Sequence, residues 1–287
     1  MRNGVKAVIF ILCFVIAAAS YMLTAKEMKP VYEVSAMELT DGMINVCEGV
    51  YVITNKEHKV NMTLVVSGGE GVLIDAGDNE EDGKVLESFL KKNNVQISNI
   101  FITHSHSDHV FNLEKFSASA SNVYKYDNTE DGQQVKVGDM SFRVLHTPGH
   151  DYNKHMSIEI EDKNILLAGD IVYSDNIPSM GYGSTYEDHV STWERLAKNR
   201  YDLIIPGHGE LVNGTLALER HLEYVKNATY KVREILKSGG SRQEINEIKL
   251  EDCMKDSSFI TASNAANLHK TNMLLIYAKV KKELGIK

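Results

Sequence analysis

This sequence has few cysteines, no surplus of basic charge and no internal repeat. Cys13 lies in an apolar N-terminal run, and the other two cysteines, Cys47 and Cys253, form no Cys-x-x-Cys motif. Three cysteines are too few for a disulfide scaffold, although one bridge between Cys47 and Cys253 stays open. The formal net charge of -8 lacks the basic footprint of a nucleic-acid-binding protein. We therefore expect no nucleic acid among the partners.

An apolar segment stands at the start of the chain. Residues 7–25 read AVIFILCFVIAAASYMLTA, contain no charged residue and follow Arg2 and Lys6. This is the layout of a secretory signal peptide, and the run is also just long enough to be an uncleaved membrane anchor. Both interpretations predict an extracytoplasmic protein (secreted, periplasmic or anchored through residues 1–25) that touches a membrane only through this segment. A buried core helix is the remaining alternative.

The rest of the chain divides into three parts. We expect residues 26–43 to form an exposed linker, because the strand signals begin only at Ile44. Residues 44–214 carry short β-rich runs with turn signals, and residues 215–287 carry helical patterns alone. The expected strand regions are 44–54, 63–77, 99–103, 140–150, 156–170 and 202–209, and the expected helices are 80–93, 108–116, 215–238, 242–255 and 262–284. The pattern predicts an α/β core followed by a helical C-terminal part.

Side chains that are costly to bury are concentrated at the ends of the expected strands. The stretch THSHSDH, residues 103–109, holds His104, His106, Asp108 and His109 directly after a strand. His104 and His106 are two residues apart in extended chain, so they can point the same way. Three further candidates follow strands in the same manner: His150 in TPGHD, Asp170 in LLAGD and His208 in IPGHG.

These residue types suit divalent metal. Neutral imidazole binds zinc, and a carboxylate can bridge two cations and balance their charge. Five histidines and two aspartates are enough for two sites that share one oxygen ligand. Such a pair of cations lowers the pKa of a bridging water and polarises a carbonyl or phosphoryl oxygen. A cluster that would be expensive to bury alone is tolerable when cations occupy it.

The order of these motifs resembles the metallo-β-lactamase-fold hydrolase superfamily. HSHSDH, TPGH, AGD and PGHG match that family in sequence order, and VLIDAG at 72–77 matches its early aspartate motif. The resemblance covers roughly residues 44–210. It implies a four-layer αβ/βα sandwich, of the α+β type, with metal in a cleft at the sheet edges.

The resemblance also implies a role for each candidate ligand. His104, His106 and His150 would hold one metal, Asp108, His109 and His208 would hold the second, and Asp170 would bridge them. Asp75 would orient a ligand loop. Because Asp170 is present and no cysteine is near it, the set is similar to that of glyoxalase II and the lactonases. The implied cofactors are two divalent ions, with zinc favoured and iron or manganese open.

The predicted function is that of a metallo-hydrolase. A metal-bridging hydroxide would attack an ester, thioester, lactone or amide of a small-molecule substrate, and Asp108 could pass a proton to the leaving group. Phosphodiester hydrolysis and β-lactam hydrolysis are alternatives that use the same kind of site. A non-catalytic metal-binding protein is an alternative from a different class.

Several tyrosines and histidines lie outside these motifs. Some lactonases resembling this chain place a tyrosine over the metals to stabilise the oxyanion, and Tyr173 is closest to Asp170 among Tyr173, Tyr182 and Tyr186. We therefore name Tyr173 as an additional catalytic candidate. His155 and His189 match no motif, and we expect them at the surface or behind the ligands.

Overall fold

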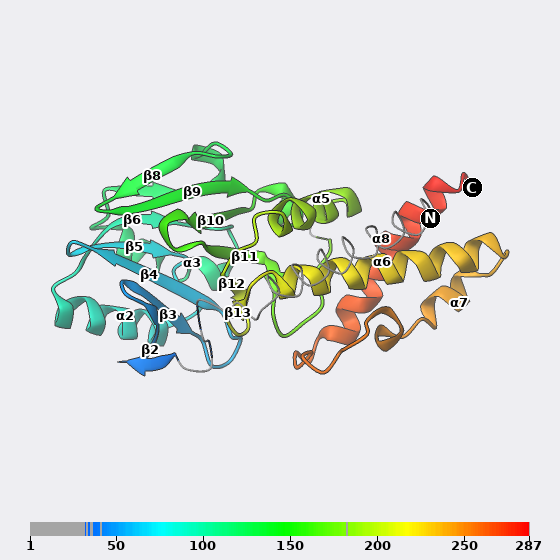
Figure 1. Ribbon diagram of the computed structural model, residues 1–287, viewed down its shortest axis with the longest axis horizontal. Coiled ribbons are helices and arrows are strands. Elements are labelled where there is room, and N and C mark those ends of the chain that lie inside the picture. Colours follow the sequence, from blue (N-terminus) through cyan, green and yellow to red (C-terminus); the bar gives the residue numbers. More distant parts are fainter. Residues whose placement is uncertain (1–31, 33, 35–36, 41, 182, 287) are drawn as a thin grey trace, which may run out of the picture. The chain divides into compact units, whose positions relative to one another are not determined.

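Short strands rich in Val, Ile and Leu form two sheets (Figure 1). The computed structural model describes residues 32, 34, 37–40, 42–181 and 183–286. Within them, the first sheet has the strand order β1-β2-β3-β4-β5-β6-β7 and the second the order β13-β12-β11-β10-β9-β8. The first sheet consists of β1 (Glu38–Thr40), β2 (Met43–Cys47), β3 (Val50–Thr54), β4 (Asn61–Ser67), β5 (Glu70–Ile74), β6 (Gln96–Phe101) and β7 (Asn122–Tyr124). The second consists of β8 (Gln134–Val137), β9 (Met140–His146), β10 (Met156–Ile160), β11 (Ile165–Tyr173), β12 (Leu203–His208) and β13 (Val212–Asn213).

Helices lie on the outer face of each sheet. On the first sheet these are α2 (Glu80–Asn93), α3 (Ser107–Val110) and α4 (Leu113–Ser117), and on the second sheet α5 (Tyr186–Ala197) and α6 (Leu216–Lys237). Helices α7 (Arg242–Asn246) and α8 (Ala265–Glu283) pack on α6. Single-turn 3-10 helices are η2 (Tyr126–Asn128), η3 (Asp151–Asn153), η4 (Glu161–Lys163) and η5 (Leu250–Cys253). The helix expected at 80–93 is confirmed, and Asn79 caps it by accepting from the Asp82 backbone N–H.

Three apolar clusters hold these layers together. The inner faces of both sheets bury Val52, Phe101 and Phe142 against one another. The outer face of the first sheet packs on α2 and α4. The outer face of the second sheet packs on α5, α6 and α8 around Trp193. The order is helix, sheet, sheet, helix, so the expected four-layer sandwich with a helical C-terminal part is confirmed.

The strand connections bring chain ends to one edge. The hairpins β2–β3 and β4–β5 are antiparallel, as expected for the start of the domain. The pairs β5–β6, β6–β7 and β11–β12 are parallel. Parallel strands end at the same edge of a sheet. The loops after β6 and β12 therefore start at the sheet edges where a site can be assembled.

The expected linker boundary needs correction. The last part of residues 26–43 belongs to the core, because β1 pairs with β2 and Met43 is completely buried. Tyr32 is also buried, and its hydroxyl donates to the Lys163 carbonyl at 2.9 Å. The compact unit begins at Tyr32 rather than Ile44. The apolar segment 7–25 lies outside the described residues.

Two expected helices are wrong in detail. Residues 108–116 form α3 and α4 rather than one helix, because Phe111 N–H and Asn112 N–H bond back to the Gly77 and Ala76 carbonyls. Residues 242–255 form the short α7 and then η5, not one helix. Cys253 is buried in this turn and, like Cys47, is a free cysteine, so the two are not bridged.

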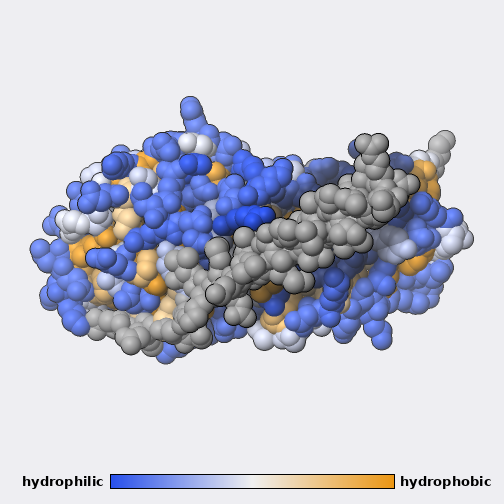
Figure 2. All heavy atoms as spheres, in the orientation of Figure 1, coloured by the Kyte–Doolittle hydropathy of each residue, from blue (hydrophilic) through white to orange (hydrophobic). Residues whose placement is uncertain are grey.

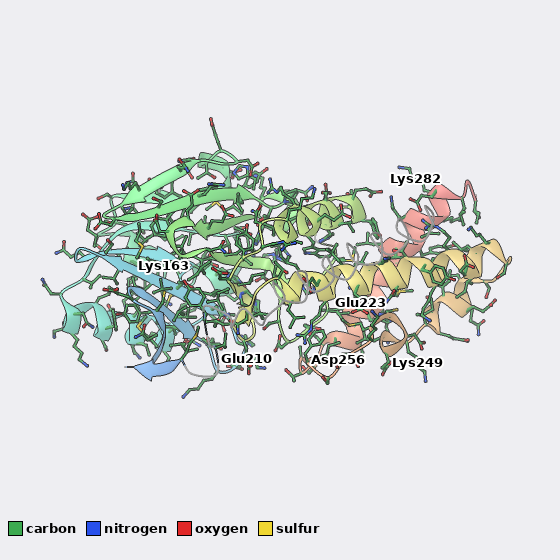
Figure 3. The ribbon with its side chains drawn as sticks, viewed as in Figure 1. Lys163, Glu210, Glu223, Lys249, Asp256 and Lys282 are labelled. Carbon is green, nitrogen blue, oxygen red and sulfur yellow. The ribbon has the colours of Figure 1, made fainter. Side chains whose placement is uncertain are left out.

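In the view of Figure 2 hydrophilic residues predominate, and apolar residues occur in small patches. Charged side chains of both signs extend from the core and from the helical part (Figure 3), among them Lys163, Glu210, Glu223, Lys249, Asp256 and Lys282. Within the described part of the chain, no helix is both long and apolar enough to cross a bilayer.

Candidate metal centre

All seven candidate ligands meet at one edge of the two sheets. They come from the turn and helix after β6, from the loop after β9, from within β11 and from the last residue of β12. Their nitrogen and oxygen atoms form two groups, and within each group they lie within 4.8 Å of one another. The first group is His104, His106, His150 and Asp170, and the second is Asp108, His109 and His208.

Three of the four members of the first group are buried, and His106 is half-buried. His150 Nε2 lies 3.2 Å from His106 Nδ1. Asp170 Oδ2 lies 3.7 Å from His150 Nε2 and 3.9 Å from His104 Nε2. The side chains of His104 and His150 are almost inaccessible to solvent. Three imidazole nitrogens and one carboxylate oxygen thus surround a single point.

The second group is nearer to solvent. His208 Nε2 lies 3.3 Å from Asp108 Oδ2, and His109 Nε2 lies 3.7 Å from the same oxygen. The His109 side chain is fully buried, whereas those of Asp108 and His208 are 27% and 19% exposed. This group therefore has one closed side and one side that opens to solvent.

Asp170 stands between the two groups. Besides its contacts with the first, its Oδ1 lies 3.2 Å from His109 Nε2 and its Oδ2 lies 3.4 Å from His208 Nε2. Four imidazoles from both groups therefore face one carboxylate. This is the position that a carboxylate shared between two cations requires.

The residues fit divalent cations. Three buried atoms that point into the cluster, His104 Nε2, His109 Nε2 and Asp170 Oδ1, form no hydrogen bond among the described residues. Buried polar atoms are almost always paired, so three orphans at one point indicate a missing partner. Imidazole nitrogen and carboxylate oxygen are the ligands that zinc takes in proteins.

Asp75 fixes the orientation of two ligand rings. Its Oδ2 accepts from His109 Nδ1 at 2.9 Å and from the Thr103 hydroxyl at 2.8 Å, and its Oδ1 accepts from the Thr103 N–H at 2.8 Å. The Thr103 oxygen in turn lies 3.1 Å from His104 Nδ1. With Nδ1 of both rings occupied, Nε2 of His104 and of His109 faces the cluster, which is how a metal-binding histidine is normally supported.

The loop between β3 and β4 holds His208. His208 Nδ1 donates to the His58 carbonyl at 2.9 Å. Buried Asn61 donates from its amide to the carbonyls of Pro206 and Gly209, both at 2.9 Å. Gly207 is required between them, because a Cβ there would lie 2.0 Å from Asp170 Oδ1.

Two residues support the ligands from behind: His155, for which this is one of the two expected positions, and Asp151, which no motif indicated. His155 is fully buried, and its Nε2 accepts from the Asp170 backbone N–H at 3.0 Å while its Nδ1 lies 2.7 Å from the Thr147 hydroxyl. Asp151 accepts from the Ser105 hydroxyl at 2.7 Å and so braces the turn between His104 and His106. Neither residue belongs to a sequence motif, because each contacts a ligand segment that lies elsewhere in the chain. His189 is likewise buried, not at the surface.

Burial lowers the pKa of the histidines in the first group. Desolvation holds the pKa of His104 well below its usual range and lowers that of His150 to about 4. Both rings are therefore neutral at pH 7, which is the form that binds metal.

The second group behaves in the opposite way. Burial alone would lower the pKa of His109, but Asp170 and Asp75 outweigh it and raise the pKa to about 10. Burial of His208 is likewise outweighed, by Asp170 and Asp108, and its pKa rises to about 11. For Asp170, burial would raise the pKa, but the neighbouring His208 and His109 hold it well below the ordinary value. The neighbouring carboxylates therefore hold protons on His109 and His208 unless a cation replaces them.

Comparison with known proteins identifies the family. The family model described as Metallo-beta-lactamase superfamily matches residues 56–128 and 119–208. This chain belongs to that superfamily. Membership confirms the resemblance drawn from the motifs and the expectation of an enzyme of the metallo-hydrolase class.

Individual relatives share about a quarter of their residues with this chain over the matched regions. The chain is 28% identical over 168 residues to "Atrochrysone carboxyl ACP thioesterase dmxR1" of Cryptosporiopsis sp. (strain 8999), which covers 53% of this chain and 50% of that protein. It is 24% identical over 246 residues to "Beta-lactamase-like protein 2 homolog" of Caenorhabditis elegans. This match covers 78% of this chain and 79% of that protein. The chain thus spans about half the length of the thioesterase. A metallo-beta-lactamase family protein from Thermus thermophilus has the same fold, with a TM-score of 0.62 at 18% identity over 84% of this chain and 95% of that one.

Tyr173 lies beside the candidate ligands. Its hydroxyl donates to Asp170 Oδ2 at 2.9 Å, and its ring stacks on His208 with the centroids 5.7 Å apart. The Tyr186 hydroxyl instead lies 3.1 Å from the Thr229 hydroxyl, and Tyr182 lies outside the described residues. Among the described members of the three tyrosines, Tyr173 is the one that contacts the candidate ligands.

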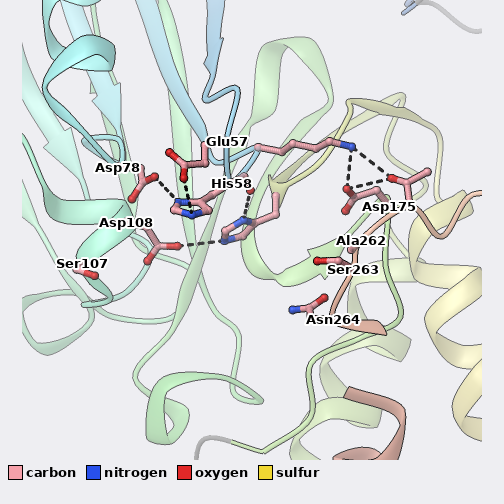
Figure 4. A pocket seen from close by; sticks show the side chains of 12 residues that line it. Glu57, His58, Asp78, Ser107, Asp108, Asp175, Ala262, Ser263 and Asn264 are labelled. Atoms are coloured by element: carbon pink, nitrogen blue, oxygen red, sulfur yellow. Dashed lines mark hydrogen bonds and ion pairs between the residues drawn. The ribbon is translucent and has the colours of Figure 1, made fainter. Parts of the chain in front are cut away.

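A cleft opens over the second group. One cavity of about 630 Å³ is lined by Asp108 and His208, and an adjoining cavity of about 340 Å³ reaches Asp170 and Tyr173. The β3–β4 loop borders the first cavity on one side, and the segment 261–264 borders it on the other (Figure 4). A small molecule entering this cleft reaches the candidate ligands from the exposed side of the second group.

Proposed function

We propose that this protein is a dinuclear metal-dependent hydrolase of an ester, thioester, lactone or amide of a small molecule. The observation that carries the proposal is the position of Asp170, whose carboxylate lies within 4 Å of imidazole nitrogens from both ligand groups. The thioesterase named among the relatives supports a carbonyl substrate. Two bound divalent ions, most simply zinc, would supply an activated water and polarise the carbonyl.

The surrounding residues suit the remaining tasks. Asp108 borders the cleft, where its carboxylate could take a proton from the attacking water. We propose that it passes this proton to the leaving group. Tyr173 presents a hydroxyl beside Asp170, from where it can donate to the oxygen on which negative charge develops.

A side-by-side substrate panel tests this proposal. The purified, metal-analysed protein is assayed with simple esters, thioesters, lactones, a β-lactam and a phosphodiester. We expect kcat/KM for at least one of the first three classes to exceed that for the β-lactam and the phosphodiester. A preferred β-lactam or phosphodiester would reverse this order. Bound metal with no turnover across the whole panel would favour a non-catalytic metal-binding protein.

We also propose that the enzyme acts outside the cytoplasm. The support is the uncharged segment 7–25 behind Arg2 and Lys6. Expression of the full chain, followed by fractionation, tests it. Recovery of activity in the cytoplasmic fraction would contradict the proposal.

A further inference from the structure

The cleft beside the candidate metal centre has unusually polar walls. Small-molecule sites are lined predominantly by hydrophobic and aromatic side chains. Among the described residues that line the two adjoining cavities, Ala262 and Leu268 alone have aliphatic side chains. The other lining residues are charged, amide, hydroxyl or imidazole side chains, with Tyr173 at the ligand end.

Two distant segments join to form this wall. Lys59, on the β3–β4 loop, lies 3.1 Å from Asp175 Oδ2 and 3.3 Å from the Thr261 hydroxyl (Figure 4). The Asp175 carbonyl accepts from the backbone N–H groups of Thr261 and Ala262 at 2.9 and 3.3 Å. The C-terminal segment is thus fastened to the residues that follow β11, and it forms a fixed side of the cleft.

The cations of the wall already have partners. Lys59 is paired with Asp175, and His58 Nδ1 lies 2.7 Å from Asp78 Oδ2. An anionic substrate group would have to compete with these carboxylates for either cation. Neither Lys59 nor His58 is therefore an unpaired cation that could bind an anionic group of the substrate.

The neutral groups of the C-terminal segment remain available. Ser263 and Asn264 are both exposed and both line the larger cavity. Asn264 accepts from the Asn176 amide at 2.8 Å through its oxygen, which leaves its own NH2 group as a donor without a hydrogen bond among the described residues. Such groups recognise amide and hydroxyl functions.

We propose that the substrate part occupying this cleft is small, uncharged and polar, with amide or hydroxyl functions, and that Ser263 and Asn264 are specificity-determining residues. This inference rests on the proposed carbonyl hydrolysis and specifies its substrate. An alkyl chain in the same place would strip water from the wall without replacing the lost hydrogen bonds, which is costly. An amide of equal size restores those bonds.

Three thioesters of N-acetylcysteamine with acyl groups of equal size test the inference. The N-acetylglycyl, hexanoyl and succinyl thioesters present an amide, an alkyl chain and a carboxylate, respectively, and each yields its acid and the thiol on hydrolysis. We expect kcat/KM for the N-acetylglycyl thioester to exceed that for either of the others by at least about tenfold. A preferred hexanoyl or succinyl thioester would overturn the inference.

A matched pair of variants locates the effect. Ser263→Leu places an aliphatic side chain in the cavity, and we expect it to lower the N-acetylglycyl-to-hexanoyl ratio of kcat/KM about tenfold. Ser258→Leu makes the same change at an exposed position of the same segment that does not line the cavities, and it should leave the ratio unchanged. Equal ratios in the two variants would show that the segment does not select the substrate.

Product binding separates this inference from the proposed function. Calorimetry compares N-acetylglycine with hexanoate on the parent protein as purified. If no thioester is hydrolysed but N-acetylglycine binds more tightly, the proposed reaction fails and the polar cleft stands. If N-acetylglycine binds no more tightly than hexanoate, the cleft inference fails whether or not turnover is seen.

Discussion

The two ligand groups differ in burial and in proton content, although one carboxylate joins them. In the first group the side chains of His104 and His150 are buried, and burial lowers their pKa values. The second opens to the cleft, and the pKa values of His109 and His208 are raised by aspartates. Where burial outweighs the neighbouring carboxylate, a histidine stays neutral and can bind a cation directly. Where carboxylates outweigh burial, the cation must compete with protons.

Metal affinity should therefore depend on pH in only one group. Because His109 and His208 have raised pKa values of about 10 and 11, both carry protons at pH 7 in metal-free protein, and a cation must displace them. We expect the affinity for the second cation to fall by up to about a hundredfold per pH unit between pH 8 and pH 6. The affinity of the first group should stay nearly constant there, because the pKa of His150 is about 4.

Calorimetric zinc titrations in buffers of different protonation enthalpy measure this difference. About two protons should be released with the second cation and almost none with the first. Equal proton release for both cations would abolish the contrast between the groups.

Removal of Asp170 should break the link between the groups. Without the shared anion, two cations at ~3.5–4 Å repel one another more strongly. We expect Asp170→Ala to retain the first cation, lose most of the second and reduce turnover by more than about tenfold. Metal analysis by mass spectrometry and kcat measurement check this.

Asp139→Ala is the control for that variant, because Asp139 is exposed on the turn between β8 and β9. Asp151→Ala is unsuitable, since Asp151 braces Ser105. Two tightly bound metals and near-parent activity in Asp170→Ala would refute the bridging role.

A smaller effect is expected from Asn61. Asn61→Ala would leave the buried carbonyls of Pro206 and Gly209 without their side-chain donor, at a cost of about 1–3 kcal/mol. Since these residues flank His208, we expect about tenfold weaker binding of the second cation and no change in the first. Asn213→Ala, a half-buried asparagine in β13, is the control. Equal weakening of both cations would mean that Asn61 supports the fold rather than one group.

Removal of residues 1–25 should have the smallest effect. Every contact that distinguishes the two groups lies between residues 58 and 208, within a unit that begins at Tyr32. We expect the truncated protein to keep its thermal midpoint, metal content and kcat/KM within error. Unfolding of this variant would instead identify the segment 7–25 as a core helix.

The ligand positions could be predicted because local order determines them. An apolar strand followed at once by THSHSDH or PGHG puts side chains at a sheet edge wherever the rest of the chain goes. Asp75 in VLIDAG was instead indicated by the resemblance to the superfamily's early aspartate motif. The structure brings all of these residues together, and their binding of metal stays a prediction.

Contacts between distant segments could not be predicted. His155 approaches Asp170 across a hairpin, and Lys59 meets Thr261 across 202 residues. No periodicity encodes such pairs. The prediction of one helix over 242–255 was wrong for a similar reason. Cys253 is buried in a core shared with α6 and α8, and this packing divides the segment into α7 and η5. Local helix-forming residues predict a helix there, and tertiary packing overrides them.

The β3–β4 loop has two roles, because the His58 carbonyl holds the His208 ring while the neighbouring Lys59 side chain closes the cleft wall. A ligand that orders this loop from the cleft side also favours the His208 orientation that a cation needs. The two binding equilibria are then thermodynamically linked, and reciprocity requires that each ligand tighten the other by the same factor. Zinc affinity measured with product present should accordingly exceed that of the protein alone, and product affinity should rise with zinc by an equal ratio.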